Sequence, residues 1–231
     1  DGTADESKDR TFKQRNSFVG LKGSMGTIFL GKHDTATKKS QKKIDLFNDL
    51  AGDIKNILQG ENRMSDLIGY TTPEINGFSA TFNAIKGTEG LGDDSIGDST
   101  STSFSYDSEN FYIALAFDSE LKGYDSTRLT LQIPFNRSKL GIMLQDSEKL
   151  STGVEEDGYV ISFSQKVGDK GTLKFQQAES DMKLDSGKQF SFGYDYKLSN
   201  KAKAFFFFTD LSGDNISKEK EITGIGFEYK F

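Results

Sequence analysis

Large apolar side chains alternate with small or charged ones in segments that recur about every ten residues along this chain. In one such segment the odd positions carry the large apolar groups, which are Phe111, Ile113, Leu115 and Phe117. The even positions of that segment are Tyr112, Ala114, Ala116 and Asp118. A period of two places the two sets on opposite faces of a β-strand, so the faces meet different environments. The sequence therefore predicts an all-β fold of two-faced strands.

About thirteen strands are expected from this alternation. Their predicted ranges are 15–23, 27–34, 65–72, 76–86, 101–108, 110–119, 127–136, 138–148, 157–167, 171–180, 188–198, 201–210 and 220–231. Four consecutive aromatic residues, Phe205 to Phe208, break the alternation. At least one of their rings must therefore face the interior or a subunit interface.

Strand length and connection length separate two folds that share this pattern, a soluble sandwich and a membrane barrel. Segments near ten residues, at about 3.3 Å per residue and a tilt of about 45°, cover the roughly 25 Å apolar band of an outer-membrane barrel. Sandwich strands are nearer about five or six residues. Tight turns also alternate with longer polar loops, expected around 87–100, 120–126, 149–157, 181–188 and 211–220. These features favour a transmembrane antiparallel β-barrel.

Composition agrees with a barrel and disfavours other classes. Mean hydropathy is −0.56 and no run approaches the roughly 20 apolar residues of a membrane helix, but half of each barrel strand faces water. The net charge of −6, without a basic stripe, argues against a nucleic-acid partner. Cysteine is absent and His33 is the one histidine, so we expect no metal site, no cofactor and no enzyme activity. An outer-membrane phospholipase is disfavoured for the same reason.

One insert interrupts the strands between residues 35 and 64. Within it, residues 41–59 repeat apolar side chains at helical spacing, which predicts one or two helical turns. Asp45, Asp49 and Asp53 would then share one helical face.

Several short segments occur in an order that points to a known family. They are Arg15-Asn-Ser-Phe-Val-Gly-Leu-Lys-Gly23, Gly31-Lys-His-Asp34, Asp45-Leu-Phe-Asn-Asp49, Glu61-Asn-Arg63, Tyr70-Thr-Thr-Pro73 with Gly77-Phe78, and the terminal Phe231. Together they resemble the trimeric general diffusion porins of Gram-negative outer membranes. The resemblance implies a sixteen-stranded barrel whose third loop folds into the lumen, and the insert 35–64 occupies that loop's position.

The family's first three strands have no counterpart here, so residues 1–231 are expected to be a single porin barrel domain lacking them. An odd strand number gives the same expectation, since single-chain bacterial barrels have even numbers. The resemblance further implies a homotrimer in the cell outer membrane that contacts lipid and lipopolysaccharide and passes small hydrophilic solutes and ions by passive diffusion. The alternative is a plugged barrel acting as an adhesin or surface-structural protein.

Charged residues on the wall and the insert are the candidate pore constriction. The resemblance implies acids on the loop facing bases on the wall, and the candidates are Arg15, Lys32, Asp45, Asp49, Asp53, Glu61, Arg63 and Arg128. For Arg15 the alternative is a rim contact to lipopolysaccharide, for Arg128 a place at the channel mouth, and for the three aspartates a solvated loop helix. The insert's lysines oppose its acids, so the sequence leaves the ion preference open.

Phe231 is the candidate assembly signal. It ends the last predicted strand on the same parity as Phe227 and Tyr229, where an aromatic suits a membrane interface. The resemblance implies that this terminal aromatic is read by the outer-membrane insertion machinery.

Overall fold

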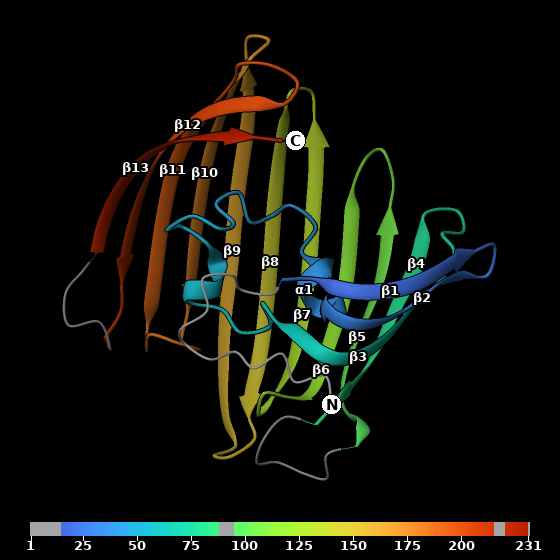
Figure 1. Cartoon of the computed structure of the whole chain (residues 1–231). Helices are drawn as coiled ribbons and strands as arrows, with labels where there is room; N and C mark the ends of the chain where they lie inside the picture. Colours follow the sequence, from blue (N-terminus) through green and yellow to red (C-terminus); the bar gives the residue numbers. More distant parts are fainter. Residues whose placement is uncertain (1–14, 88–94, 215–219, 231) are drawn as a thin grey trace.

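The computed structural model describes residues 15–87, 95–214 and 220–230. Within them the chain forms one antiparallel sheet of thirteen strands, in which each strand pairs with the next along the sequence (Figure 1). The strands are β1 (Ser17–Gly23), β2 (Gly26–Asp34), β3 (Arg63–Thr71), β4 (Phe78–Lys86), β5 (Ile96–Asp107), β6 (Tyr112–Leu121), β7 (Tyr124–Phe135), β8 (Ser138–Lys149), β9 (Val154–Val167), β10 (Gly171–Ser180), β11 (Gly187–Lys197), β12 (Ala202–Ser212) and β13 (Lys220–Tyr229). Each predicted range overlaps one of these strands, which confirms the all-β antiparallel fold. Phe231 lies outside the described residues.

The two faces of the sheet differ in polarity, and the apolar face is the exposed one, as in the wall of a membrane barrel. Leu115, Leu129 and Leu144 are direct cross-strand neighbours on one face and are 39%, 39% and 50% exposed. The adjacent row on the other face contains Arg128 and Gln145, which are 0% and 2% exposed. Large apolar groups therefore lie outside and polar groups inside, the reverse of a soluble sandwich. We call these the outer and inner faces.

The connections fall on two rims. The C-terminal ends of β2, β4, β6, β8, β10 and β12 lie on one rim, here called the loop rim, and those of the odd-numbered strands lie on the other, here called the turn rim. The long loops predicted at 120–126 and 149–157 are wrong. The strands there continue into polar residues beyond their apolar segments, so the connections are short. Only Lys122 and Gly123 join β6 to β7, at φ of 55° and 82°, as in the two-residue turns that hairpins favour. The β8–β9 connection is 150–153.

Residues 35–62, here called the inner loop, leave the loop rim after β2 and fold across the inner face (Figure 1). The one or two helical turns expected within 41–59 are present as a single short turn, and the helical face expected to carry Asp45, Asp49 and Asp53 is wrong. The loop has a five-residue helix, α1 (Ala36–Ser40), and a single 3-10 turn, η1 (Ile54–Asn56). Between them the backbone turns repeatedly, and Lys42 and Asp49 take positive φ of 53° and 64°, which interrupts any helix. No helix in the described residues is long and apolar enough to cross a membrane.

The apolar residues that suggested a helix instead pack the inner loop onto the wall. Ile44, Ile54, Ile57 and Leu58 are fully buried in a cluster with inner-face residues of β8, β9, β10 and β12. Those wall residues are Met143, Val160, Ala178 and Leu211, joined by Met182 from the β10–β11 connection. Burying a side chain of this size stabilises by about 1.5–3 kcal/mol. The apolar side chains of the inner loop therefore form a buried core with the wall.

The Phe205 to Phe208 run is divided between the two faces. Phe205 and Phe207 lie on the inner face, opposite Gly226 and Gly224 of β13, and a Cβ at either glycine would collide with the facing ring. Phe206 contacts Phe192 on the outer face, with ring centroids 6.4 Å apart. The run thus keeps the strand alternation, and the glycines make room for the inner rings. Among the described residues no ladder joins β13 to β1.

Candidate functional site

Polar side chains from successive wall strands fix the backbone of the inner loop. Asn83 of β4 accepts from the Ala36 amide (2.7 Å), and Ser101 of β5 accepts from the Thr37 amide (3.1 Å). On the far wall, Gln176 of β10 accepts from the Leu46 amide (2.8 Å). The Gln176 side chain also donates to the carbonyl of Gly52 (2.9 Å). Hydrogen bonds from β4, β5 and β10 to backbone groups of the inner loop therefore hold the loop in one position across the inner face.

Arg128 of β7 and Glu61 form the central clamp between wall and inner loop. Their side chains are 0% and 4% exposed and approach to 2.8 Å. The Arg128 guanidinium also donates to the carbonyl of Gln59 (2.8 Å) and to the side chain of Gln145 (2.8 Å). Burial raises the pKa of Glu61, and the nearby Arg128 charge opposes that rise. Both residues belong to the constriction candidates, but the structure buries them beneath the loop, so neither side chain faces open space.

The three aspartates do not share a helical face. Asp45 accepts from the backbone amides of Phe47 (3.0 Å) and Ile54 (3.3 Å), so its carboxylate ties two turns of the loop together. Burial, followed by the neighbouring charge of Asp53, raises the pKa of Asp45 to about 7. The Asp45 carboxylate therefore stabilises the fold of the loop's own backbone.

Asp53 and Asp49 are also engaged. Asp53 accepts from the amides of Asp49 and Lys55 (both 2.9 Å) and pairs with the Lys55 ammonium at 2.8 Å. The hydrogen bond to Asp53 raises the pKa of Lys55. Asp49 pairs with Arg15 at 3.0 Å, and both side chains are more than half exposed. Arg15 thus reaches the inner loop from just before β1.

A cavity of about 640 Å³ remains open beside the inner loop. Three acids line it, namely Asp34, Asp45 and Asp195. Eight bases line it, namely Arg15, Lys38, Lys39, Lys42, Lys43, Arg63, Lys174 and Lys203. Although the whole chain carries a charge of −6, the space beside the loop has an excess of positive charge.

The cavity contains some of the constriction candidates and omits others. Arg15, Asp45 and Arg63 line it, and Arg63 pairs with Asp34 at 3.0 Å. Lys32 lies in β2 opposite Ser17 and is not among the lining residues. Sequence reasoning missed Lys174, Asp195 and Lys203, because charges at inner positions of β10 to β12 were read only as a generic polar parity. Their place on neighbouring strands was the signal that could have found them.

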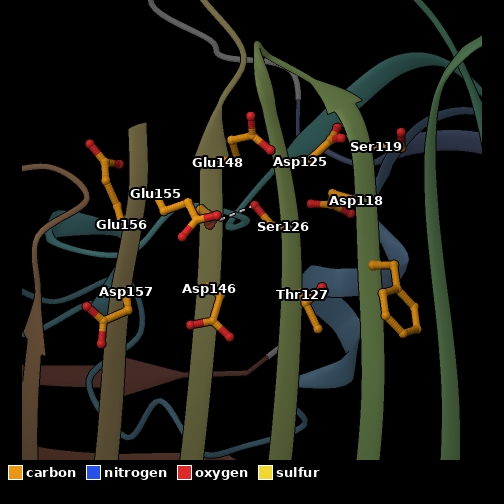
Figure 2. Close-up of a pocket in the computed structure, with 12 residues that line it drawn as sticks. Asp118, Ser119, Asp125, Ser126, Thr127, Asp146, Glu148, Glu155, Glu156 and Asp157 are labelled. Carbon is orange, nitrogen blue, oxygen red and sulfur yellow. Dashed lines mark hydrogen bonds between the residues drawn. The ribbon is translucent and has the colours of Figure 1, made fainter. Parts of the chain in front are cut away.

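Acidic residues gather in a second cavity at the loop rim (Figure 2). It measures about 810 Å³, and its lining acids are Asp118, Asp125, Asp146, Glu148, Glu155, Glu156 and Asp157. Asp146 pairs across the sheet with Thr127 and Asp157, two positions beyond Leu144, so these side chains share the outer face. The two cavities therefore separate the charges, with bases beside the inner loop and acids at the loop rim.

Three comparisons bear on the family. A family model described as Gram-negative porin matches residues 2–216. The chain belongs to the Gram-negative porin family. Among curated proteins, outer membrane porin protein 32 of Delftia acidovorans is 26% identical over 242 residues, which cover 94% of this chain and 67% of that protein.

Solved structures of porins share the fold. The anion-selective porin from Comamonas acidovorans matches with a TM-score of 0.79 at 23% identity, over 94% of this chain and 78% of that one. The trimer form of the outer-membrane protein OmpT from Vibrio cholerae matches with a TM-score of 0.67 at 14% identity, over 93% of this chain and 80% of that one. The present porin is thus an outer-membrane channel protein of Gram-negative type, with an inside-out sheet and a loop on its inner face.

Proposed function

We propose that this porin passes small hydrophilic solutes by passive diffusion through a channel narrowed by the inner loop, with preference for anions. The observation that carries the proposal is the lining of the 640 Å³ cavity, in which eight bases face three acids. Charged rings of one sign favour the passage of ions of the opposite sign.

The excess of bases arises because Asp53 and Glu61, two of the loop's acids, do not line the cavity. The carboxylates of Asp45 and Asp53 accept backbone amides of the loop, and Glu61 is buried against Arg128. The loop lysines Lys39 and Lys43 instead line the open space. The loop therefore adds positive charge to the cavity lining, where the family pattern has acids on the loop facing bases on the wall. The name of the Comamonas relative, an anion-selective porin, supports the same preference.

Closure of the sheet into a barrel and assembly into a homotrimer belong to the same proposal. An unpaired strand edge in hydrocarbon would leave backbone polar groups unsatisfied at several kcal/mol each, so β1 and β13 require partner strands in the membrane. The exposed leucines of the outer face fit contact with lipid, and the OmpT trimer supports a three-fold assembly.

Neutralising loop lysines tests the proposal. In planar bilayers under a KCl gradient, Lys39→Gln with Lys43→Gln should move the reversal potential toward cation preference, because two positive charges leave the cavity lining. The matched control is Lys122→Gln with Lys188→Gln, two lysines that line none of the cavities described above and whose loss should leave the potential unchanged. An equal shift in both double variants would contradict the proposal, and a silent wild-type protein would support the plugged barrel.

A further inference from the structure

A row of alternating charges crosses four neighbouring strands of the inner wall. Lys174 of β10 pairs with Asp195 of β11 at 2.9 Å, and Asp195 pairs with Lys203 of β12 at 3.3 Å. Lys203 in turn pairs with Glu228 of β13 at 3.3 Å. One carboxylate, that of Asp195, therefore bridges two ammonium groups.

Contacts with the inner loop fix one end of this row. The Lys174 side chain is 8% exposed and donates to the carbonyl of Leu46 at 3.1 Å. Its ammonium also lies 4.9 Å from the centre of the Phe47 ring. Lys203 is more accessible, with 34% of its side chain exposed, and lies 5.7 Å from the centre of the Phe205 ring. The Lys174 ammonium is thus held against the inner loop, whereas the ion pairs and the ring contact of Lys203 are with residues of the wall.

The same residues connect two basic cavities. A cavity of about 240 Å³ at the turn rim is lined by five lysines, which are Lys170, Lys197, Lys201, Lys203 and Lys230. Its acids are Asp195 and Glu228. Asp195 and Lys203 also line the cavity beside the inner loop. The Asp195–Lys203 pair therefore lies between the lysines beside the inner loop and those at the turn rim.

Two lysines converging on one point would bind a carboxylate strongly if that point were empty. Charge-assisted hydrogen bonds from two cations to one anion are among the strong polar contacts in proteins. A channel, however, conducts only when a solute binds well enough to enter and weakly enough to leave. The convergent position is already taken by a carboxylate of the wall itself.

We propose that Asp195 is a specificity-determining residue that keeps anion passage fast. Its carboxylate occupies the position between Lys174 and Lys203, so anionic solutes move along the remaining lysines without being held there. This inference rests on the proposed anion preference and adds the residue that limits how tightly anions bind.

Replacing Asp195 by asparagine tests the inference in the full chain, with succinate as the probe. Chloride current is recorded in planar bilayers while succinate is added to one side. In Asp195→Asn the succinate concentration that halves the current should fall on the order of tenfold relative to wild type, because the two ammonium groups lose their shared wall carboxylate and can pair with a carboxylate of the solute. Adding Lys203→Gln to that variant should restore the wild-type value, since one of the two cations is then missing. Asp146→Asn removes the same charge from the outer face and should leave succinate inhibition unchanged.

Equal half-blocking concentrations in wild type and Asp195→Asn would overturn the inference. If Asp195→Asn does not assemble, Asp195→Ser removes the same carboxylate with a smaller polar side chain and should produce a shift in the same direction; no shift would again overturn the inference. The wild-type reversal potential separates the two proposals. A wild type without anion preference contradicts the proposed function, whereas an anion-preferring wild type with unshifted variants contradicts the role of Asp195 alone.

Discussion

Single side chains decide the electrostatics of this channel wall, because the burial of a few charges determines which others face water. The Arg128–Glu61 pair lies beneath the inner loop with four hydrogen bonds from the guanidinium. The sequence indicated that both residues point inward, from parity and from the family resemblance. It could not indicate that they meet each other, because their contact depends on the path of the loop between them.

Removing one member of that clamp should be costly. In Arg128→Met, Glu61 stays buried without its cation, and breaking a buried pair in this way typically destabilises by about 3–5 kcal/mol. Heat-modifiable mobility of the folded barrel on gels measures the loss as a lower unfolding temperature. The double variant Arg128→Met with Glu61→Gln should recover part of that temperature, since no unpaired charge remains. A double variant less stable than the single one would contradict the clamp.

Asp45 should make ion preference depend on pH. Its pKa is raised to about 7 by burial and by Asp53, and it lines the basic cavity. As pH falls through about 7 the carboxylate becomes neutral, so the cavity gains net positive charge. The reversal potential in a KCl gradient should therefore indicate stronger anion preference at pH 5.5 than at pH 8.5, and Asp45→Asn should abolish most of the difference. The same pH dependence in Asp45→Asn would assign it to other groups.

Stability should change with the same group, in a definite direction. Because the folded-state pKa of Asp45 lies above its ordinary value of 3.8, the folded loop holds its proton more tightly than the unfolded chain does. This contribution is fully present below about pH 3.8 and is lost as pH rises toward about 7. Hydrogen exchange of the Phe47 and Ile54 amides, which donate to Asp45, should thus show more protection at pH 5.5 than at pH 8 after correction for intrinsic rates. No such change in wild type would contradict the raised pKa.

At the scale of elements, the strands and the inward position of the inner loop were predictable, and the local structure of that loop was not. A two-faced strand can be recognised from its period of two. The predicted bounds of all thirteen strands therefore lie within about five residues of the observed bounds. The apolar spacing of Ile44, Ile54 and Ile57 was read as helical, but it reflects the burial of these side chains in one cluster with residues of several wall strands. Local periodicity cannot distinguish those cases, because the partner residues lie more than eighty positions away.

Close approach of the inner loop to the wall should make Gly60 intolerant of a side chain. It has φ of +83°, and a Cβ there would lie 2.8 Å from a guanidinium nitrogen of Arg128. Gly60→Ala should destabilise the folded barrel by about 1–3 kcal/mol, from strain at positive φ and displacement of Arg128. Gly168, also at positive φ but with open space around its Cβ position, supplies the control. Equal losses in unfolding temperature for both alanine variants would show that backbone strain alone matters.

At the scale of the whole molecule, the exposed leucines outside and the basic cavity inside describe one wall of an outer-membrane channel. The sequence predicted the inside-out sheet, because segment length and parity report the environment of every strand. It left the ion preference open, because net charge does not show which acids accept hydrogen bonds from backbone amides or form buried ion pairs. That division of the acids emerges only when the inner loop is placed on the wall.

The reversal potential of the wild-type protein in a planar bilayer tests this description most directly. With a tenfold KCl gradient at neutral pH, single channels should reverse at a potential of the sign set by chloride. A potential near zero, or one of the sign set by potassium, would contradict the proposed channel lined by the basic cavity beside the inner loop.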